Sequence, residues 1–157
     1  MQPTHLIAVG FGSGLSPLAP GTFGTLAALP LVWLMAAFSP AYYLLIVVLC
    51  FWLGIVVCAA TADDLGVHDH RAIVWDDVVG YLLTLWPVAF SWPAAIAGFV
   101  LFRIFAIVKP WPIGIIDKRL AGGWGIMLDD AVAALFAAVL LVVMQLVGWL
   151  PGAGLRA

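Results

Sequence analysis

The acidic residues of this 157-residue chain are all aspartates, and all eight lie between positions 63 and 130. A solvated surface usually mixes aspartate with glutamate, which suits helices better. Aspartate also prefers loops and helix starts, which accounts for part of this bias. A set of short carboxylates confined to one part of the chain indicates in addition that they hold something fixed, such as a cation. The eight are Asp63, Asp64, Asp69, Asp76, Asp77, Asp117, Asp129 and Asp130.

Two adjacent pairs of aspartates stand next to long apolar runs. Asp76 and Asp77 end the segment DDLGVHDHRAIVWDD, and Asp129 and Asp130 precede the last apolar run. Adjacent side chains diverge by about 100° on a helix, so we expect one of each pair to bind an ion while the other orients a water or a second ion. Several carboxylates without a cysteine or histidine framework suit Mg²⁺. The four residues are therefore candidate Mg²⁺ ligands and catalytic groups; the alternative is a juxtamembrane loop with aspartates at helix starts.

Basic and glycine-rich segments near these pairs suit a phosphate group. Arg103 and Lys109 are separated by apolar residues, and the segment 10–25, GFGSGLSPLAPGTFGT, holds five glycines. Thr22 could begin a helix whose N-terminus attracts phosphate, although a plain entry loop with a threonine cap is the alternative. Mg²⁺ and phosphate at a membrane surface predict phosphoryl transfer or hydrolysis on a lipid, with metal-activated water as the simplest nucleophile.

The composition predicts an integral membrane protein formed from residues 1–157 as one domain. The chain is 66% hydrophobic and 9% charged, against about 25% charged in an average soluble domain, and its mean hydropathy is +1.19. A net charge of −2 excludes a broad basic face for nucleic acid. Cys50 and Cys58 lie in one apolar run and form neither a disulfide framework nor a metal pair. No cleavable signal peptide is visible.

Three apolar stretches predict membrane-spanning helices in an all-α bundle. They cover residues 22–38, 41–60 and 131–150, each near the roughly 20 residues that a span needs. A fourth stretch, 78–102, contains Pro87 and the sequence Ser-Trp-Pro at 91–93. It crosses the membrane once, or it turns back as a re-entrant pair packed inside protein. The apolar count slightly favours one span, whereas the charges favour the turn.

We predict the broken, re-entrant pair, at about residues 78–106, because it brings Asp77 and Arg103 together. It also collects all the basic residues except Arg156 at one face. Basic residues near spans mark the cytoplasmic side. The charged face is thus expected to be cytoplasmic, with the N-terminus inside and the C-terminus outside.

The motifs resemble those of the bacterial phosphatidylglycerophosphatase A family. The resemblance covers about residues 6–135 and is carried by GFGSGLSPLAPGTFG, GVHDH, IVWDD, FR with KPWPI, and GGWGIMLDD. It implies Mg²⁺-dependent removal of the terminal phosphate from phosphatidylglycerophosphate, giving phosphatidylglycerol, at the bacterial inner membrane. The phospholipid and the membrane are the expected partners, with no required protein partner. The residues expected to bind the substrate are Arg103, Lys109, Thr22, Gly21 and His70.

Two positions depart from the family pattern. Asp77 stands where the family has glutamate, and Ala106 stands where it has an aspartate between the Arg and the Lys-Pro. On a helix, Arg103, Ala106 and Lys109 form one stripe, so a carboxylate at 106 would lie between two bases. Its absence predicts an enzyme that binds its lipid phosphate but turns it over slowly.

The alternative function is a small ion-coupled transporter or channel, since intramembrane carboxylates and broken helices also mark ion pathways. A carrier usually shows an internal repeat, and none is evident between the two halves. Its carboxylates should lie in the middle of a span, whereas all eight are expected in connecting segments here. The sequence therefore favours the phosphatase.

Overall fold

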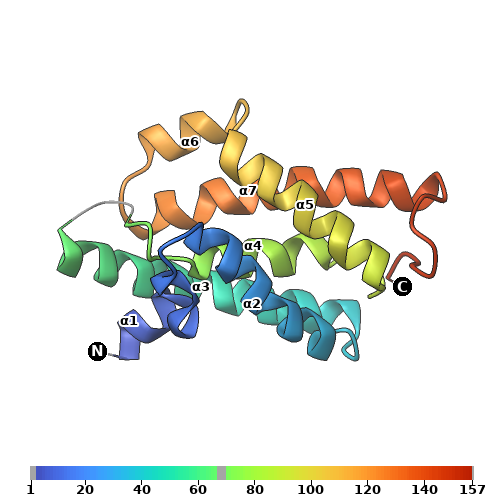
Figure 1. Cartoon of the computed structure of the whole chain (residues 1–157), viewed down its shortest axis with the longest axis horizontal. Coiled ribbons are helices and arrows are strands. Elements are labelled where there is room, and N and C mark those ends of the chain that lie inside the picture. Colours follow the sequence, from blue (N-terminus) through green and yellow to red (C-terminus); the bar gives the residue numbers. More distant parts are fainter. Residues whose placement is uncertain (1–2, 67–69, 157) are drawn as a thin grey trace.

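The computed structural model describes residues 3–66 and 70–156, and these fold into a bundle of helices (Figure 1). Within these ranges the extended structure is limited to an isolated bridge between Val88 and Leu155, so the all-α prediction is confirmed. The helices are α1 (Pro3–Ala8), the 3₁₀ helix η1 (Gly10–Leu15), α2 (Pro20–Met35), α3 (Pro40–Leu65), α4 (Trp75–Leu85), α5 (Trp92–Val108), α6 (Ile113–Arg119) and α7 (Gly122–Leu146).

Two of the described helices, α3 with 26 residues and α7 with 25, are long and apolar enough to cross a membrane. A third span results if α5 and α6, bent by 52° where they join, are counted as one. The expected first span at 22–38 corresponds to α2, which has 16 residues and is a shorter apolar helix. The described residues therefore offer two clear spans, or three with the bent pair, instead of the three expected at 22–38, 41–60 and 131–150, and α2 packs mainly against α4.

The aspartates within residues 3–66 and 70–156 lie in helices, so for these the prediction of connecting segments was wrong. Helix α7 begins at Gly122, well before residue 131, and therefore includes Asp129 and Asp130. Asp76 and Asp77 lie in the first turn of α4, while α3 and α6 contain the other described aspartates. An apolar count stops at charged residues, but a helix continues through them when basic groups lie close enough to compensate their charge.

The apolar stretch 78–102 is broken into α4 and α5, which are joined by residues 86–91. Ser91 begins α5, and its hydroxyl oxygen accepts a hydrogen bond from the backbone N–H of Ala94 at 3.2 Å. The turn places the start of α4 beside the end of α5, where Asp77 and Arg103 form an ion pair. The hairpin is thus preferred to one continuous helix; its re-entry from one membrane face stays a prediction.

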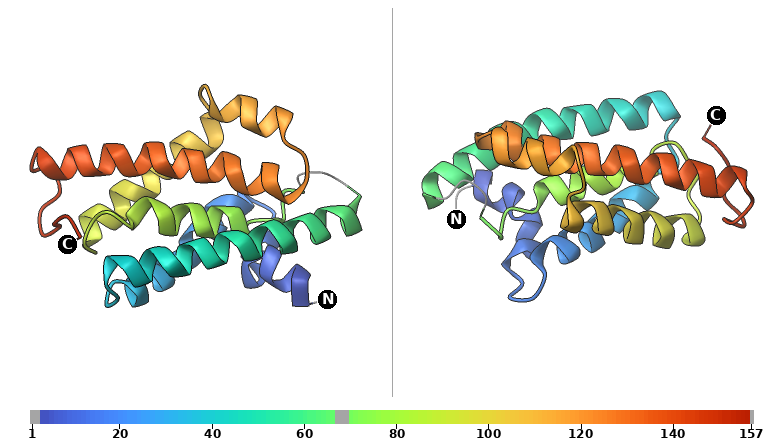
Figure 2. Two further views of the ribbon diagram at one scale, coloured as in Figure 1. Left: turned by 180° about the vertical axis from the view of Figure 1, so that it is seen from behind. Right: turned by 90° about the horizontal axis from the view of Figure 1, so that it is seen from above.

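Helix α7 packs against α3, α4, α5 and α6 and holds the bundle together (Figure 2). Its first turn lies very close to α3, since a Cβ at Gly123 would overlap the carbonyl oxygen of Ile55. One turn further along, a Cβ at Gly54 would lie 2.5 Å from the sulfur of Met127. These glycines let two long helices approach at the end where α7 carries its aspartates.

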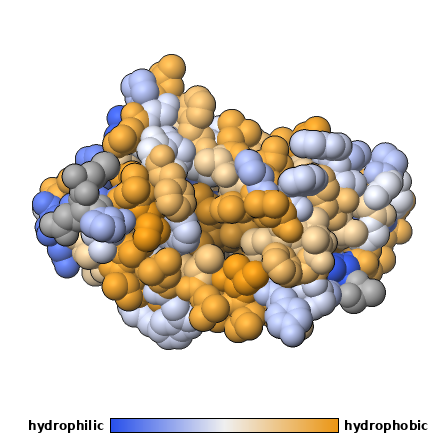
Figure 3. Space-filling view, turned by 90° about the horizontal axis from the view of Figure 1, so that it is seen from below, coloured by the Kyte–Doolittle hydropathy of each residue, from blue (hydrophilic) through white to orange (hydrophobic). Residues whose placement is uncertain are grey.

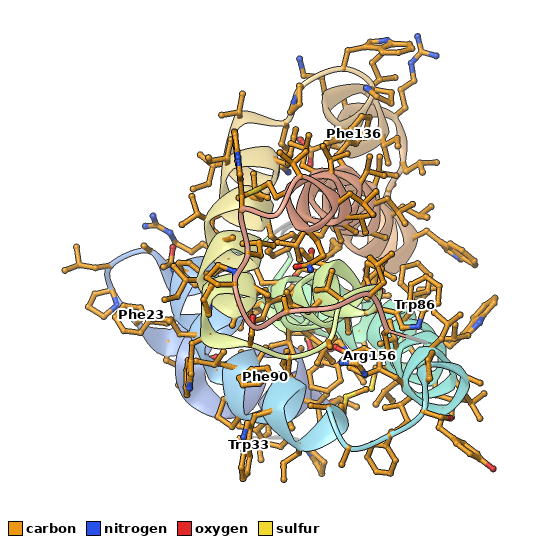
Figure 4. The ribbon with its side chains drawn as sticks, turned by 90° about the vertical axis from the view of Figure 1, so that its right-hand side faces the viewer. Phe23, Trp33, Trp86, Phe90, Phe136 and Arg156 are labelled. Carbon is orange, nitrogen blue, oxygen red and sulfur yellow. The ribbon has the colours of Figure 1, made fainter. Side chains whose placement is uncertain are left out.

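The two ends of the bundle differ. The N-terminus and the aspartates lie toward one end, and the C-terminus lies at the other (Figure 1). At that second end the C-terminal segment covers the α4–α5 turn, where the backbone N–H of Arg156 donates to the carbonyl of Pro87 at 3.0 Å. The Arg156 guanidinium lies 4.4 Å from the centre of the Tyr43 ring (Figure 4). We call this end, where the C-terminal segment covers the α4–α5 turn, the closed end, and the opposite end the charged end.

The surface between the two ends is apolar. In Figure 3 hydrophobic residues cover the middle of one face, and hydrophilic ones gather toward the left end. Exposed side chains such as Trp52, Leu49 and Val139 contribute to this surface. A soluble monomer rarely exposes so much contiguous apolar area. The exposed apolar helices thus indicate that the protein associates with a membrane.

Gly80 allows α4 and α5 to approach, and we predict that Gly80→Ala destabilises the bundle. An added Cβ would lie 2.5 Å from the Phe102 ring. Overpacking of this kind costs about 1–3 kcal/mol, which exceeds the gain of about 1 kcal/mol in helix propensity. The measurement is denaturant unfolding in detergent micelles.

Two further variants make this test specific. Adding Phe102→Leu to Gly80→Ala should restore part of the lost stability, because the two side chains share one space. Gly154→Ala should change little, since nothing lies within 4 Å of its added Cβ. Equal or higher stability of the Gly80→Ala protein would contradict the close packing of α4 and α5.

Candidate active site

Three carboxylates meet at the start of α4. Asp76, Asp77 and Asp130 each offer an oxygen atom, and these atoms all lie within 4.8 Å of one another. The sequence predicted that adjacent aspartates could not share one ion, because they diverge on a helix. In the fold, Asp130 comes from α7 and approaches between the two diverging side chains, so all three reach one place. The fold thus brings an oxygen of both Asp76 and Asp77 close to Asp130, and the predicted division of roles within the pair stays a prediction.

Arg103 compensates part of this negative charge. Its guanidinium donates to the Asp77 carboxylate in an ion pair that is mostly shielded from solvent. The start of α2 lies against this pair: a Cβ at Gly21 would overlap the Asp77 carboxylate and lie 3.1 Å from the guanidinium nitrogens of Arg103. Glycine is required at position 21 because any side chain would displace one of the two charged groups.

Lys109 holds the second aspartate of the α7 pair. Its ammonium donates to Asp129 at 2.7 Å and to Asp117 at 2.8 Å, while the backbone N–H of Asp130 donates to the other Asp129 oxygen at 2.9 Å. Burial lowers the pKa of Lys109, but its bonds and charge interactions with Asp117 and Asp129 outweigh this, so the pKa lies above its usual value. The two aspartates of α7 therefore have different partners. Asp130 lies with Asp76 and Asp77, whereas Asp129 is held by Lys109.

These groups line one cavity of about 220 Å³ at the charged end. The four aspartates predicted as ligands are among its lining residues, together with Arg103, Lys109, Gly21 and Ala106. Ala106 is 8% exposed, on the stretch of α5 between the two bases. Helix α5 ends at Val108, and Lys109 follows it with a left-handed φ of 47°. The predicted helical stripe therefore holds for Arg103 and Ala106, while Lys109 reaches the same cavity from the turn after the helix.

Two predicted binding residues are not among those that line the cavity. Thr22 does not cap α2, because the helix begins at Pro20 after Ala19, whose φ is 46°. The His70 ring nitrogen Nδ1 accepts a hydrogen bond from the backbone N–H of Ala72 at 3.2 Å, which supports its own loop. Asp69, also a candidate carboxylate, lies outside the described residues.

The sequence analysis missed Arg71 as a cavity residue. Arg71 lines the cavity and is exposed. Within residues 3–66 and 70–156, the ion pairs of arginine and lysine side chains involve Arg103 and Lys109 only. Arg71 is therefore a further base on the cavity wall, apart from the ion pairs that Arg103 and Lys109 form. Its position beside His70, in the segment that ends with Asp76 and Asp77, was the available signal.

The residues present fit a divalent cation. Three carboxylate oxygens within 4.8 Å of one another are hard donors of the kind that Mg²⁺ takes in proteins. Two of the three residues, Asp77 and Asp130, are buried. Carboxylates gathered away from water repel one another unless a positive charge lies among them.

Apolar helices around a cavity lined by carboxylates and bases define a membrane-associated protein with a charged pocket at one end of its bundle. The chain belongs to the phosphatidylglycerophosphatase A family, whose profile matches residues 6–145. It is 49% identical over 141 residues to Phosphatidylglycerophosphatase A of Escherichia coli, covering 89% of this chain and 82% of that protein. It is 46% identical over 147 residues to Phosphatidylglycerophosphatase A of Haemophilus influenzae, covering 92% and 90%. No solved structure matches the chain.

The ion pairs of Lys109 should stabilise the charged end, and we predict that Lys109→Gln lowers the free energy of unfolding by about 2 kcal/mol. Breaking a fully buried pair costs about 3–5 kcal/mol, and the effect is smaller here because the Lys109 side chain is 27% exposed. Lys118→Gln is the control, since Lys118 is exposed and none of the described ion pairs involves it. Equal unfolding of the two variants in detergent would show that Lys109 does not hold α6 to α7.

Proposed function

We propose that this protein removes the terminal phosphate of phosphatidylglycerophosphate, giving phosphatidylglycerol and inorganic phosphate. The observation that carries the proposal is the cavity that joins the Asp76, Asp77 and Asp130 carboxylates to Arg103 at one end of an apolar bundle. The printed names of the two bacterial relatives supply the substrate. The ion-coupled transporter is not favoured, because the charged cavity groups gather at one end of the bundle and both bacterial relatives are named as phosphatases.

Asp76, Asp77 and Asp130 are the proposed ligands of Mg²⁺. A bound Mg²⁺ would neutralise charge on the phosphate and lower the pKa of a water molecule. Asp129 has a different proposed role, because its carboxylate is held by Lys109. It positions that base and, through the backbone of the next residue, the ligand Asp130.

The bases of the cavity are the proposed phosphate-binding groups. Lys109 has three N–H donors, of which Asp117 and Asp129 take two, so the third can reach a phosphate oxygen. The Nε of Arg103 is buried without a hydrogen-bond partner among the described residues, and an anion in the cavity would satisfy it. Arg71 adds a third positive charge at the cavity wall.

The proposed location is the bacterial inner membrane, with the cavity open to the cytoplasm. The basic residues of the α4–α7 region lie near the charged end, and Arg156 lies at the closed end. Since basic residues near spans mark the cytoplasmic side, the charged end would face inward. Phosphate released there enters the cytoplasm while the lipid product stays in the membrane.

The metal proposal predicts that Asp76→Asn, Asp77→Asn and Asp130→Asn each lower phosphate release from phosphatidylglycerophosphate by at least about 10- to 100-fold. Asp63→Asn is the control, because Asp63 is exposed at the end of α3 and should retain full activity. Mg²⁺ should also raise the unfolding temperature of the wild-type protein, by mass action, and not that of Asp130→Asn. Full activity of all three variants would refute the ligand assignment.

The substitution Ala106→Asp is predicted to raise kcat by about 10²-fold, if the carboxylate acts as a general base, with a smaller change in KM. Ala106 lines the same cavity as Arg103 and Lys109, and two neighbouring cations would keep the new carboxylate ionised. Ala106→Asn is the matched control, having the same size without the charge. Equal kcat values for Ala106→Asp and the wild-type protein would mean that position 106 carries no chemistry.

A further inference from the structure

We propose that the apolar groove between α2 and α5 holds an acyl chain of the lipid whose phosphate occupies the charged cavity. The inference rests on the proposed function, and it adds a binding site for the part of the substrate that carries no charge. The groove lies between Leu26 and Leu29 of α2 and Ile96 and Phe99 of α5, with Tyr81 of α4 at its base, and has a volume of about 130 Å³.

The groove continues along both helices. A second hollow of about 220 Å³ shares Leu29 and Trp92 with the first and extends it to Trp33. The Trp33 side chain projects outward from the bundle beside α2 (Figure 4). The two hollows together form one apolar path, open to the membrane, between helices that contact each other only weakly.

Apolar side chains line the groove, and the polar atom at its base is not free to bind a ligand. The hydroxyl of Tyr81 donates to the carbonyl of Ala95 at 2.8 Å, so this polar atom is already satisfied inside the protein. The Tyr81 ring packs edge-on against Phe99, with 6.2 Å between ring centres. Such a surface suits a hydrocarbon chain and disfavours a polar ligand.

The α5 wall of the groove lies on the same helix face as Arg103 of the charged cavity, and Phe99 of the groove is one helical turn away from Arg103. Trp92, Ile96, Phe99 and Arg103 follow one another at spacings of four, three and four residues, which places them on one helix face. The eleven residues from Trp92 to Arg103 correspond to about 16 Å along the axis. Helix α2 runs alongside, with Gly21 at the cavity and Leu29 further toward the closed end.

The position of the groove beside the charged cavity indicates which molecule binds in it. A lipid phosphate that enters the cavity must place its chains along the adjacent apolar surface, and the groove is the path that begins there. A helix of a second copy is about 10 Å across with its side chains, which is too wide for a hollow of about 130 Å³. A single hydrocarbon chain needs far less room than a helix.

The groove orients the lipid substrate for the reaction. Lipid tails are as apolar as leucine side chains, so moving a chain from the membrane into the groove gives little hydrophobic gain. A seated chain instead fixes the glycerol and the phosphate relative to Asp76, Asp77 and Asp130, and a displacement of about 1 Å costs on the order of 10²-fold in rate. Blocking the groove should therefore slow the reaction of substrates with long chains selectively.

The test compares Ile96→Trp with Ile104→Trp. Both isoleucines lie on α5 and are exposed, 62% and 49% respectively, but only Ile96 lines the groove. Each protein is assayed on dioleoyl phosphatidylglycerophosphate and on the deacylated head group, which has the same phosphate and no chains. We expect Ile96→Trp to lower kcat/KM for the diacyl lipid about tenfold and to leave the deacylated substrate unchanged, while Ile104→Trp changes neither.

A loss of the same size on both substrates, or no loss on either, would overturn the groove assignment. Conversion of a dimer to a monomer by Ile96→Trp would also overturn it, because the groove would then be an interface between copies. Failure of the wild-type protein to release phosphate from any substrate would instead refute the proposed function.

Photo-crosslinking tests the groove independently of turnover. A lipid phosphate with a diazirine in its chain should label peptides of α2 and α5 more than a lipid with the same chain and no phosphate monoester. Equal labelling by the two lipids would mean that the groove does not select the chain of a phosphate-bearing lipid, which would overturn the inference.

Discussion

The structure depends on the burial of carboxylates inside an apolar bundle, because each buried charge is costly unless an opposite charge meets it. Arg103 meets Asp77, which fixes the end of α5 to the start of α4. Lys109 meets Asp117 and Asp129, which ties the α5–α6 connection to α6 and α7. These ion pairs therefore offset the cost of burying the aspartates. They also fix how α4, α5, α6 and α7 pack against one another. The helices also pack closely at Gly21, Gly80 and Gly123, where an added Cβ would overlap neighbouring atoms.

Much of the fold was predictable because apolar length and charge grouping are properties of the sequence. The helices α3 and α7 follow from apolar count, and the α4–α5 hairpin follows from the need to bring Asp77 to Arg103. The start of α7 was missed, since charged residues end an apolar count although they do not end a helix. The candidate site was predicted in its residue types, but the division between Asp129 and Asp130 depends on which base reaches each carboxylate. Arg71 was missed for the same reason, because only the folded loop brings it to the cavity.

The end of α5 shows how a local backbone feature serves the site. Lys109 follows the last helical residue and has a φ of 47°, and its backbone N–H donates to the carbonyl of Phe105. This left-handed residue, followed by Pro110, ends the helix and starts the turn toward α6. The termination places its ammonium between an aspartate of α6 and one of α7.

The charge balance of the cavity bears on both the cation and position 106. Four aspartates and three bases line it, so when all are ionised the cavity carries an excess of one negative charge. A phosphate monoester is itself an anion, and like charges at short range repel strongly in a medium of low dielectric. A divalent cation reverses the sign of the cavity, which supports the proposal that Asp76, Asp77 and Asp130 bind Mg²⁺ before phosphate enters. With alanine at position 106 the excess stays at one negative charge, so the cavity attracts phosphate once the divalent cation is bound. The neighbouring bases could also have balanced the charge of a carboxylate at this position, which this chain lacks.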